Sequence, residues 1–153
     1  MASLDGNAQS PIAVRTGLLA NTPTGDTTLF TITGPIRLVK IVGVVSTTAM
    51  AAAATGCLLK VTVDALAATD ICAVLDLTGA TVGTQLSITG TFADNLIATA
   101  VGVAIEQAGA ISISPIGTAI IELENAGAAN AGQTFWCAEY VPTDPAARMI
   151  AAF

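Results

Sequence analysis

The strongest constraint on the fold is the regular spacing of short β-branched segments along the chain. Segments that alternate apolar and polar side chains recur every ten to fifteen residues, and turns rich in Gly, Thr, Asn and Ala separate them. No stretch shows a sustained helical period of apolar residues. This pattern predicts an all-β protein, an antiparallel β-sandwich or jelly-roll-like barrel of about eight or nine short strands.

The expected strands lie at 27–33, 36–46, 57–65, 71–77, 85–90, 110–114, 118–124 and 134–141. Strand 57–65 is expected to be half-buried, because Leu59, Val61 and Val63 share one face. The segment 95–102 fits either a short helix or a strand.

The segment 36–46 is apolar on both faces, which predicts a central or doubly covered strand. Strict alternation divides it into two sets of side chains. One face carries Ile36, Leu38, Lys40, Val42 and Val44, and the other carries Arg37, Val39, Ile41, Gly43 and Val45.

Two terminal segments lack the strand rhythm. Residues 1–26 are polar around one apolar patch at 11–14, and residues 142–153 follow a Pro-x-x-Pro break. Such segments are typical of extended arms. The sequence therefore predicts an N-terminal arm at 1–26, a β domain at 27–141 and a C-terminal arm at 142–153.

One uncharged stretch is long enough to span a bilayer as a helix. Residues 41–59 contain no charge, with Lys40 and Lys60 at the two ends. Its β-branched start, its Ala- and Thr-rich middle and the absence of aromatic belts favour two strands joined by a loop. We therefore expect no membrane association.

Charge and composition exclude several classes of function. The chain contains no His, so Ser–His, Cys–His and His-ligated metal chemistry are absent. A net charge of −6, with five Lys and Arg spread along the chain, predicts no nucleic-acid partner. Hydrophobic residues make up 53% and charged residues 10%, which indicates a protein that covers much of its surface with partners.

The candidate chemical groups each have a simpler interpretation. Glu122 and Glu124 share one face of a predicted strand at a separation of roughly 6.6 Å, which is in the range that glycosidase carboxylates use. They also mark the solvated face of an ordinary half-buried strand. Asp64, Asp70 and Asp76 suggest a calcium site, because carboxylate oxygens bind hard cations. No calcium-loop motif surrounds them, so they are expected to be solvated turn residues. We expect no enzyme, no catalytic residue, no cofactor and no metal.

The cysteines do not form a disulfide pattern. Cys57, Cys72 and Cys137 are odd in number and widely spaced. They are expected to be small buried apolar residues of a protein in a reducing compartment. Near the start of the chain, Asp5 stands where a secretory signal needs a cationic residue, and no apolar core follows, so we expect synthesis in the cytoplasm without export.

The order of these features resembles a known class of proteins. A short polar arm, the run GDTTLFTITGPIRLVKIVGVVS, an Ala- and Thr-rich β domain and the run TFWCAEYVPTDP resemble small virion structural proteins of tailed bacteriophages, most closely capsid decoration (cement) proteins. The likeness covers 25–45 and 134–145 by pattern and the middle of the chain by composition.

The resemblance implies a non-enzymatic protein on the outer surface of the capsid. Its partners would be the major capsid protein and copies of itself, most often in a homotrimer. The expected assembly contacts are Ile12, Val14, Trp136, Tyr140, Met149, Ile150 and Phe153. The alternatives are a tail, neck or fibre-base component of the virion and a glycan-binding β-sandwich.

Overall fold

The fold consists of two antiparallel sheets that face each other without closing into a barrel. The computed structural model describes residues 10–19, 24–50, 54–99, 107–128 and 131–153. In the first sheet the spatial order is β1 (Ile12–Arg15), β10 (Thr134–Pro142), β3 (Ile36–Val45), β6 (Gln85–Ser87) and β7 (Ile97–Thr99), and β8 (Ile111–Ile113) pairs with the other half of β3.

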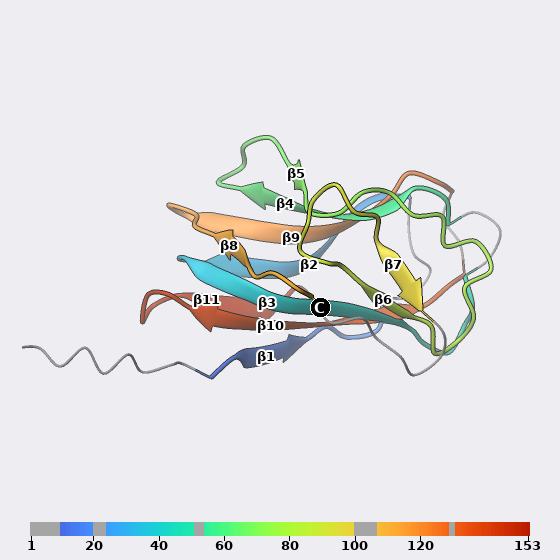
Figure 1. Cartoon of the computed structure of the whole chain (residues 1–153), viewed down its shortest axis with the longest axis horizontal. Coiled ribbons are helices and arrows are strands. Elements are labelled where there is room, and N and C mark those ends of the chain that lie inside the picture. Colours follow the sequence, from blue (N-terminus) through green and yellow to red (C-terminus); the bar gives the residue numbers. More distant parts are fainter. Residues whose placement is uncertain (1–9, 20–23, 51–53, 100–106, 129–130) are drawn as a thin grey trace, which may run out of the picture.

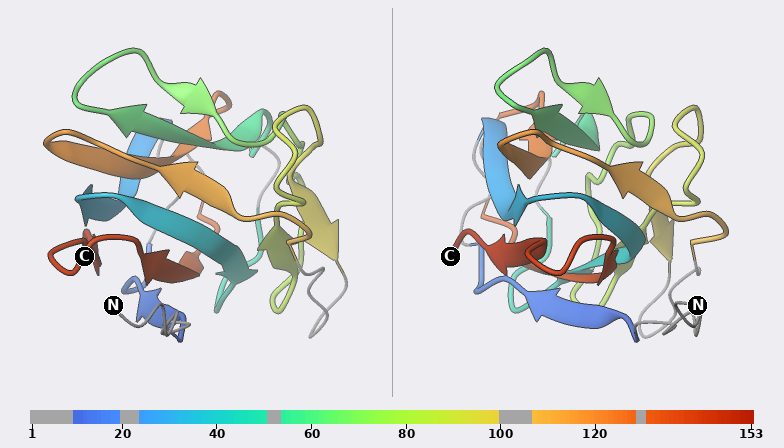
Figure 2. Two further views of the ribbon diagram at one scale, coloured as in Figure 1. Left: turned by 60° about the vertical axis from the view of Figure 1, so that its left-hand side comes forward. Right: turned by 90° about the vertical axis from the view of Figure 1, so that its left-hand side faces the viewer.

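The second sheet has the order β11 (Arg148–Ala151), β2 (Gly25–Thr33), β9 (Thr118–Asn125), β4 (Cys57–Val63) and β5 (Thr69–Asp70). The described residues contain strands, bridges and turns but no helix. Figures 1 and 2 show the two layers, with β4 and β9 on one side and β3 and β10 on the other. The predicted all-β antiparallel sandwich is confirmed.

The central strand β3 contains a bulge that the alternation of its sequence does not reveal. In its pairing with β10, Glu139 lies opposite Lys40 and Tyr140 lies opposite Leu38, so Val39 has no partner of its own. The extra residue reverses the faces of the strand at this point. Leu38 points into the core on one side of the bulge and Ile41 and Val45 do so on the other, all three fully buried.

The strict division of β3 into two faces was therefore wrong, because it ignored the bulge. Its inward set is Ile36, Leu38, Ile41, Gly43 and Val45. The central position predicted for this strand is confirmed, since β3 has neighbours on both edges.

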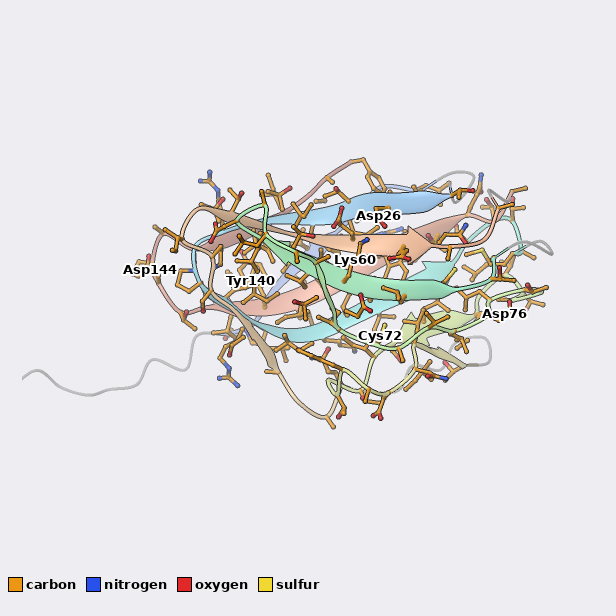
Figure 3. All side chains as sticks on the ribbon, turned by 90° about the horizontal axis from the view of Figure 1, so that it is seen from above. Asp26, Lys60, Cys72, Asp76, Tyr140 and Asp144 are labelled. Carbon is orange, nitrogen blue, oxygen red and sulfur yellow. The ribbon has the colours of Figure 1, made fainter. Side chains whose placement is uncertain are left out.

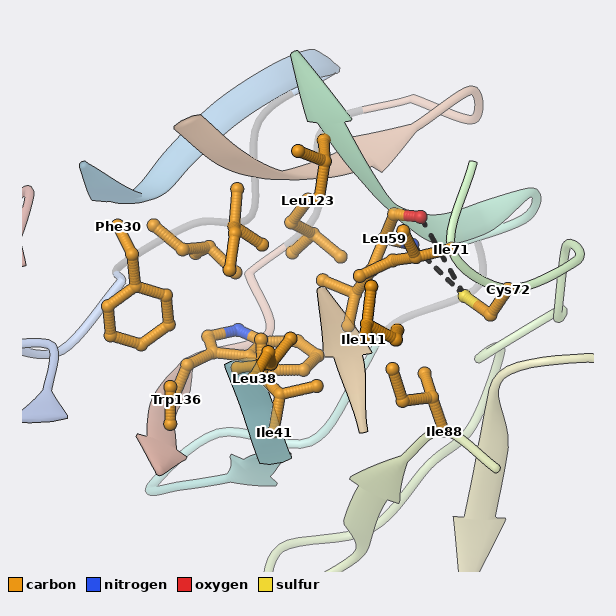
Figure 4. Packing of buried hydrophobic residues seen from close by; sticks show 14 of the residues in the cluster. Phe30, Leu38, Ile41, Leu59, Ile71, Cys72, Ile88, Ile111, Leu123 and Trp136 are labelled. Atoms are coloured by element: carbon orange, nitrogen blue, oxygen red, sulfur yellow. Dashed lines mark hydrogen bonds between the residues drawn. The ribbon is translucent and has the colours of Figure 1, made fainter. Parts of the chain in front are cut away.

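Trp136 fills the middle of the space between the sheets. Its side chain is fully buried among aliphatic residues of both sheets, including Leu38 and Ile41 (Figure 4). The indole Nε1–H donates a hydrogen bond to the hydroxyl of Thr134 at 3.2 Å, which satisfies its polar group inside the core. The ring lies against Gly43, where a Cβ atom would come within 2.7 Å of it.

The strand expected at 71–77 is not formed. The segment that pairs with β4 is β5, at Thr69–Asp70, and residues 71–77 make only single bridges at Ala73 and Leu75. Ile71 and Cys72 are both 1% exposed. Two adjacent side chains that both point inward break the alternation that a regular strand requires. In the ambiguous segment 95–102, Ile97–Thr99 form a strand and 100–102 lie outside the described residues.

The two terminal segments each supply one edge strand, one to each sheet. Within the segments expected as arms, β1 pairs with β10 along the edge of the first sheet, and β11 pairs with β2 along the edge of the second. Both additions follow the ladder hydrogen bonding of the sheets, so the described parts of these segments belong to the β domain.

The long uncharged stretch is divided between strands. Ile41 to Val45 belong to β3 and Cys57 to Leu59 belong to β4, with residues 51–53 outside the described part. Among the described residues there is no helix of the length and hydropathy that crossing a bilayer requires.

Candidate assembly surface

The two glutamates proposed as a carboxylate pair are engaged on the outer face of the second sheet. The Lys60 amino group contacts Glu124 at 3.1 Å and Asp26 at 2.6 Å (Figure 3). The hydroxyl of Thr62 donates a hydrogen bond to Glu122 at 2.9 Å. With these partners, Glu122 and Glu124 belong to a row of polar side chains on the solvated face of the strand, as expected for an ordinary half-buried strand.

Lys60 sits in a largely covered position, with only 11% of its side chain exposed. Burial by itself lowers the pKa of this amine, but hydrogen bonds and charge attraction from Asp26 and Glu124 outweigh burial and raise the pKa. The amine therefore stays charged and cannot act as a neutral base.

Two of the three aspartates considered for calcium accept local backbone hydrogen bonds, and the third, Asp70, lies in β5. The Asp64 carboxylate accepts backbone hydrogen bonds from Ile116, Gly117 and Thr118 at 2.7 to 3.0 Å. Asp76 accepts one from the backbone N–H of Thr78 at 2.8 Å. The described residues contain no group of three Cys, Asp or Glu placed to hold a metal ion.

The cysteines are free thiols. Burial, with a smaller contribution from Asp76, raises the pKa of Cys57 to about 11. Burial also raises the pKa of Cys72 to about 11, against the effect of the 3.2 Å hydrogen bond from the Leu59 backbone N–H to its sulfur. Thiols with such pKa values stay protonated at neutral pH, which makes them poor nucleophiles.

The segments that carry the seven residues predicted as assembly contacts are neighbours at one side of the sandwich. The residues belong to β1, β10 and the C-terminal segment that contains β11, and Ile12 of β1 lies directly opposite Tyr140 of β10. Figures 1 and 2 show the first and last strands of the chain next to each other on this side. The sequence alone contains no information on this convergence.

Three of the seven are core residues, which corrects the prediction for them. Trp136, Tyr140 and Met149 are at most 3% exposed. The pleat of β10 and β11 turns their side chains toward the space between the sheets, and the protein itself covers them. They stabilise the sandwich and offer no surface to a partner in this conformation.

The remaining four lie on β1, on β11 and at the last residue of the sequence, and none of them is fully buried. Ile12, Ile150 and Phe153 are 44%, 54% and 45% exposed, and Val14 is partly buried. Leu18, which the sequence analysis did not single out, is 46% exposed. We call Ile12, Val14, Leu18, Ile150 and Phe153 of the two terminal segments the terminal seam. Ile150 alternates with the buried Met149, so its side chain faces away from the space between the sheets.

One hydrogen bond joins the two sheets at the seam. The Gly17 backbone N–H donates to the Phe153 carbonyl oxygen at 2.8 Å. A Cβ atom on Gly17 would lie 3.4 to 3.6 Å from Phe153, so the two segments are in van der Waals contact. The bond lies just beyond β1 and β11, so it closes one end of the seam.

Basic side chains flank the seam on both sheets. The chain has five Lys and Arg residues, and two of them, Arg15 and Arg148, lie on β1 and β11 and are exposed. The Arg15 guanidinium stacks over the ring of Phe135 at 4.0 Å, which fixes it on the outer face of the first sheet. Among the described residues, the ion pairs are those of Lys60, so neither arginine is neutralised by a described carboxylate.

A second exposed apolar feature lies on two loops. Leu66 is 70% exposed and Ile116 is 101% exposed. The hydrogen bonds from Ile116, Gly117 and Thr118 to Asp64 hold the two loops together, and Asp64 and Ala65 adopt positive φ angles of 50° and 57°. We call Leu66 and Ile116 the loop tip.

An apolar groove of about 200 Å³ lies between the two sheets, lined by Val61, Val63, Ile71, Phe92, Ile111 and Ile113 among others. Its volume is below the range of about 300–1,000 Å³ typical of small-molecule sites.

Comparison with family models, curated proteins and solved structures finds no match.

Proposed function

We propose that this protein is a structural component of a phage virion, a decoration protein that stabilises the head by bridging major capsid subunits. The observation that carries the proposal is the terminal seam. Exposed apolar side chains lie there on two edge strands and on the segments that follow them, which the Gly17–Phe153 hydrogen bond connects, and each strand also carries an exposed arginine. Exposed apolar groups grouped in this way are typical of protein–protein contacts.

The low charge of the chain supports the same role. Charged residues make up 10% of the sequence, and nine large hydrophobic residues of the described part are at least 44% exposed. A subunit of a symmetric shell makes many simultaneous contacts, so each of them can be weak and weakly charged. In this proposal the protein works as a homotrimer on the outer capsid surface and catalyses no reaction.

The decisive experiment is quantitative mass spectrometry of intact particles. We expect a copy number close to that of the major capsid subunit, and particles that lack the protein should lose heat or osmotic stability. A much lower copy number would assign the protein to the tail, neck or fibre base. Absence from the particle, or unchanged stability without the protein, would overturn the proposal.

A pair of matched variants tests the surface itself. Ile150→Ser with Phe153→Ser makes the seam more polar, and Leu66→Ser with Ile116→Ser does the same at the loop tip. When purified protein is added back to particles that lack it, the seam variant should bind at least tenfold more weakly than the wild type. The loop-tip variant should bind like the wild type, and the reverse result would remove the seam from the proposal.

A further inference from the structure

The hydrogen-bond register of β1 shows which of its backbone groups bond with β10 and which point away from it. The Thr16 N–H donates to the Trp136 carbonyl at 2.9 Å, so Thr16 belongs to the residues that bond with β10. Antiparallel pairs alternate, and the bonding set is therefore Ile12, Val14 and Thr16. Ala13 and Arg15 direct their N–H and C=O groups away from β10, to the free edge.

The same argument applies to β11. The Ala152 N–H donates to the Leu29 carbonyl at 3.0 Å, which places Arg148, Ile150 and Ala152 in the set that bonds with β2. Met149 and Ala151 direct their backbone groups away from β2. Within the described residues, no backbone partner is recorded for the outward groups of Ala13, Arg15, Met149 or Ala151.

The side chains of β1 differ on its two faces. Ile12 and Val14 lie opposite Tyr140 and Ala138, which are buried, so their side chains face the inside of the sandwich at its edge. Arg15 lies opposite Cys137 and faces outward, over Phe135. A strand added to this edge would meet apolar groups on its inner face, and Ala13 and the Arg15 guanidinium on its outer face. Behind Ala13 on that outer face lies Glu139 of β10, which is itself opposite Lys40 of β3.

We infer that the free edge of β1 accepts an extended segment of the partner protein in which apolar residues alternate with acidic ones. The added strand bonds with the outward groups of Ala13 and Arg15, packs apolar side chains on Ile12 and Val14, and pairs a carboxylate with Arg15. The identity of the partner as the capsid subunit rests on the proposed function. The alternation of apolar and acidic residues in the segment rests only on the side chains of β1.

Charge complementarity favours this partner over a second copy of the chain. The protein carries a net charge of −6, yet both free edges at the seam carry an exposed arginine, Arg15 on β1 and Arg148 on β11. If β1 paired with β1 of a second copy around a two-fold axis, the two Arg15 side chains would share one face of the ribbon. Like charges in that position repel each other. An acidic segment in the same place puts a carboxylate beside Arg15, so the interaction is attractive.

Titration with a synthetic peptide, observed by NMR on the full chain, tests the inference. The probe is the acetylated and amidated hexapeptide Glu-Val-Thr-Val-Glu-Val, and the matched control replaces each Glu by Lys. We expect the largest shifts at the amides of Ala13 and Arg15, and binding at least tenfold tighter for the acidic peptide. Shifts located at the loop tip or in the groove, or no shifts at millimolar peptide, would overturn the inference.

Charge reversal at Arg15 provides a second test. Arg15→Glu should weaken binding of the acidic peptide at least tenfold and strengthen binding of the basic one. Arg37→Glu on β3 makes the same charge change away from the edge and should leave both affinities unchanged. Equal effects of the two variants would indicate a general charge effect and contradict the assigned edge.

Further outcomes separate this inference from the proposed function. Shifts at the same amides that depend on protein concentration without peptide would identify a second copy as the occupant and overturn the choice of partner. Peptide binding at the edge by a protein that is absent from particles would contradict the virion role and leave the strand site standing.

Discussion

The Gly17 backbone N–H donates a hydrogen bond to the Phe153 carbonyl oxygen at 2.8 Å, and this bond joins the edge of one sheet to the edge of the other. It connects the segment after β1 to the segment after β11, so the two ends of the described chain hold each other in place. The seam beside this bond is the surface on which the proposed function depends.

Deletion of Phe153 should open this connection without unfolding the core. The Gly17 amide loses its acceptor, and a net hydrogen-bond contribution of about 1 kcal/mol corresponds to roughly a fivefold loss of protection. Hydrogen exchange measured by NMR should show this loss at Gly17, while the Trp136 amide, which donates to the Thr16 hydroxyl at 3.0 Å, keeps its protection. Phe153→Ala retains the carbonyl and should retain protection at Gly17; equal loss in both variants would show that the ring is what matters.

Gly43→Ala should destabilise the protein by about 1–3 kcal/mol, the usual effect of overpacking a filled core. The new Cβ would lie 2.7 Å from the indole of Trp136, which the surrounding aliphatic side chains hold in place. Urea denaturation followed by tryptophan fluorescence measures the change. Gly109→Ala is the control, because nothing lies within 4 Å of its added Cβ, and a stability loss no larger at Gly43 than at Gly109 would contradict this packing.

Asp64→Asn should lower the melting temperature at neutral pH, because the carboxylate accepts three backbone hydrogen bonds from the loop after β8. Backbone hydrogen bonds from Ile116 and Gly117 hold the pKa of Asp64 below its usual value of 3.8. A lowered pKa means that the stabilisation is complete above the unfolded-state pKa and is lost as the pH falls through the folded-state pKa.

Melting curves at pH 7 and near pH 3 check this dependence. The difference in melting temperature between wild type and Asp64→Asn should shrink at the lower pH. Asn also tolerates the positive φ of 50° at this position, so the variant removes the charge without new backbone strain. A difference that is constant with pH would exclude the carboxylate as its source.

Thiol labelling at pH 8 should distinguish the buried cysteines from the third. Cys57 and Cys72 should remain unlabelled in the native protein, since burial raises the pKa of each to about 11 and blocks access. Cys137 is partly exposed and should react slowly, because burial raises its pKa despite the opposing effect of Arg15. Mass spectrometry should find one label per native chain and three in denaturant, and rapid labelling of Cys72 would contradict the packing shown in Figure 4.

The predicted assembly contacts show that residue type alone does not distinguish core residues from contact residues. Trp136 and Phe153 are both large aromatics near the end of the chain, and both were expected to contact a partner. Trp136 is fully buried, whereas Phe153 is 45% exposed. Apolar character indicates that a side chain gains from burial, but the strand that carries it decides which surface covers it.

The class of the fold and most of its strands follow from local patterns in the amino-acid sequence. β2, β3, β4, β9 and β10 lie where alternation and turn residues place them, because pleat period and turn chemistry are local properties of the chain. The absence of His and the wide cysteine spacing are equally local facts, and they limited the possible chemistry.

The buried face of each strand and the position of β1 and β11 at the sheet edges depend on tertiary contacts. The bulge at Val39 reverses the faces of β3, and it exists only in the pairing of Glu139 and Tyr140 with a distant strand. Likewise, the terminal seam forms because β1 and β11 join different sheets that meet at Gly17 and Phe153. Such features depend on contacts between residues far apart in the chain, which no local pattern contains.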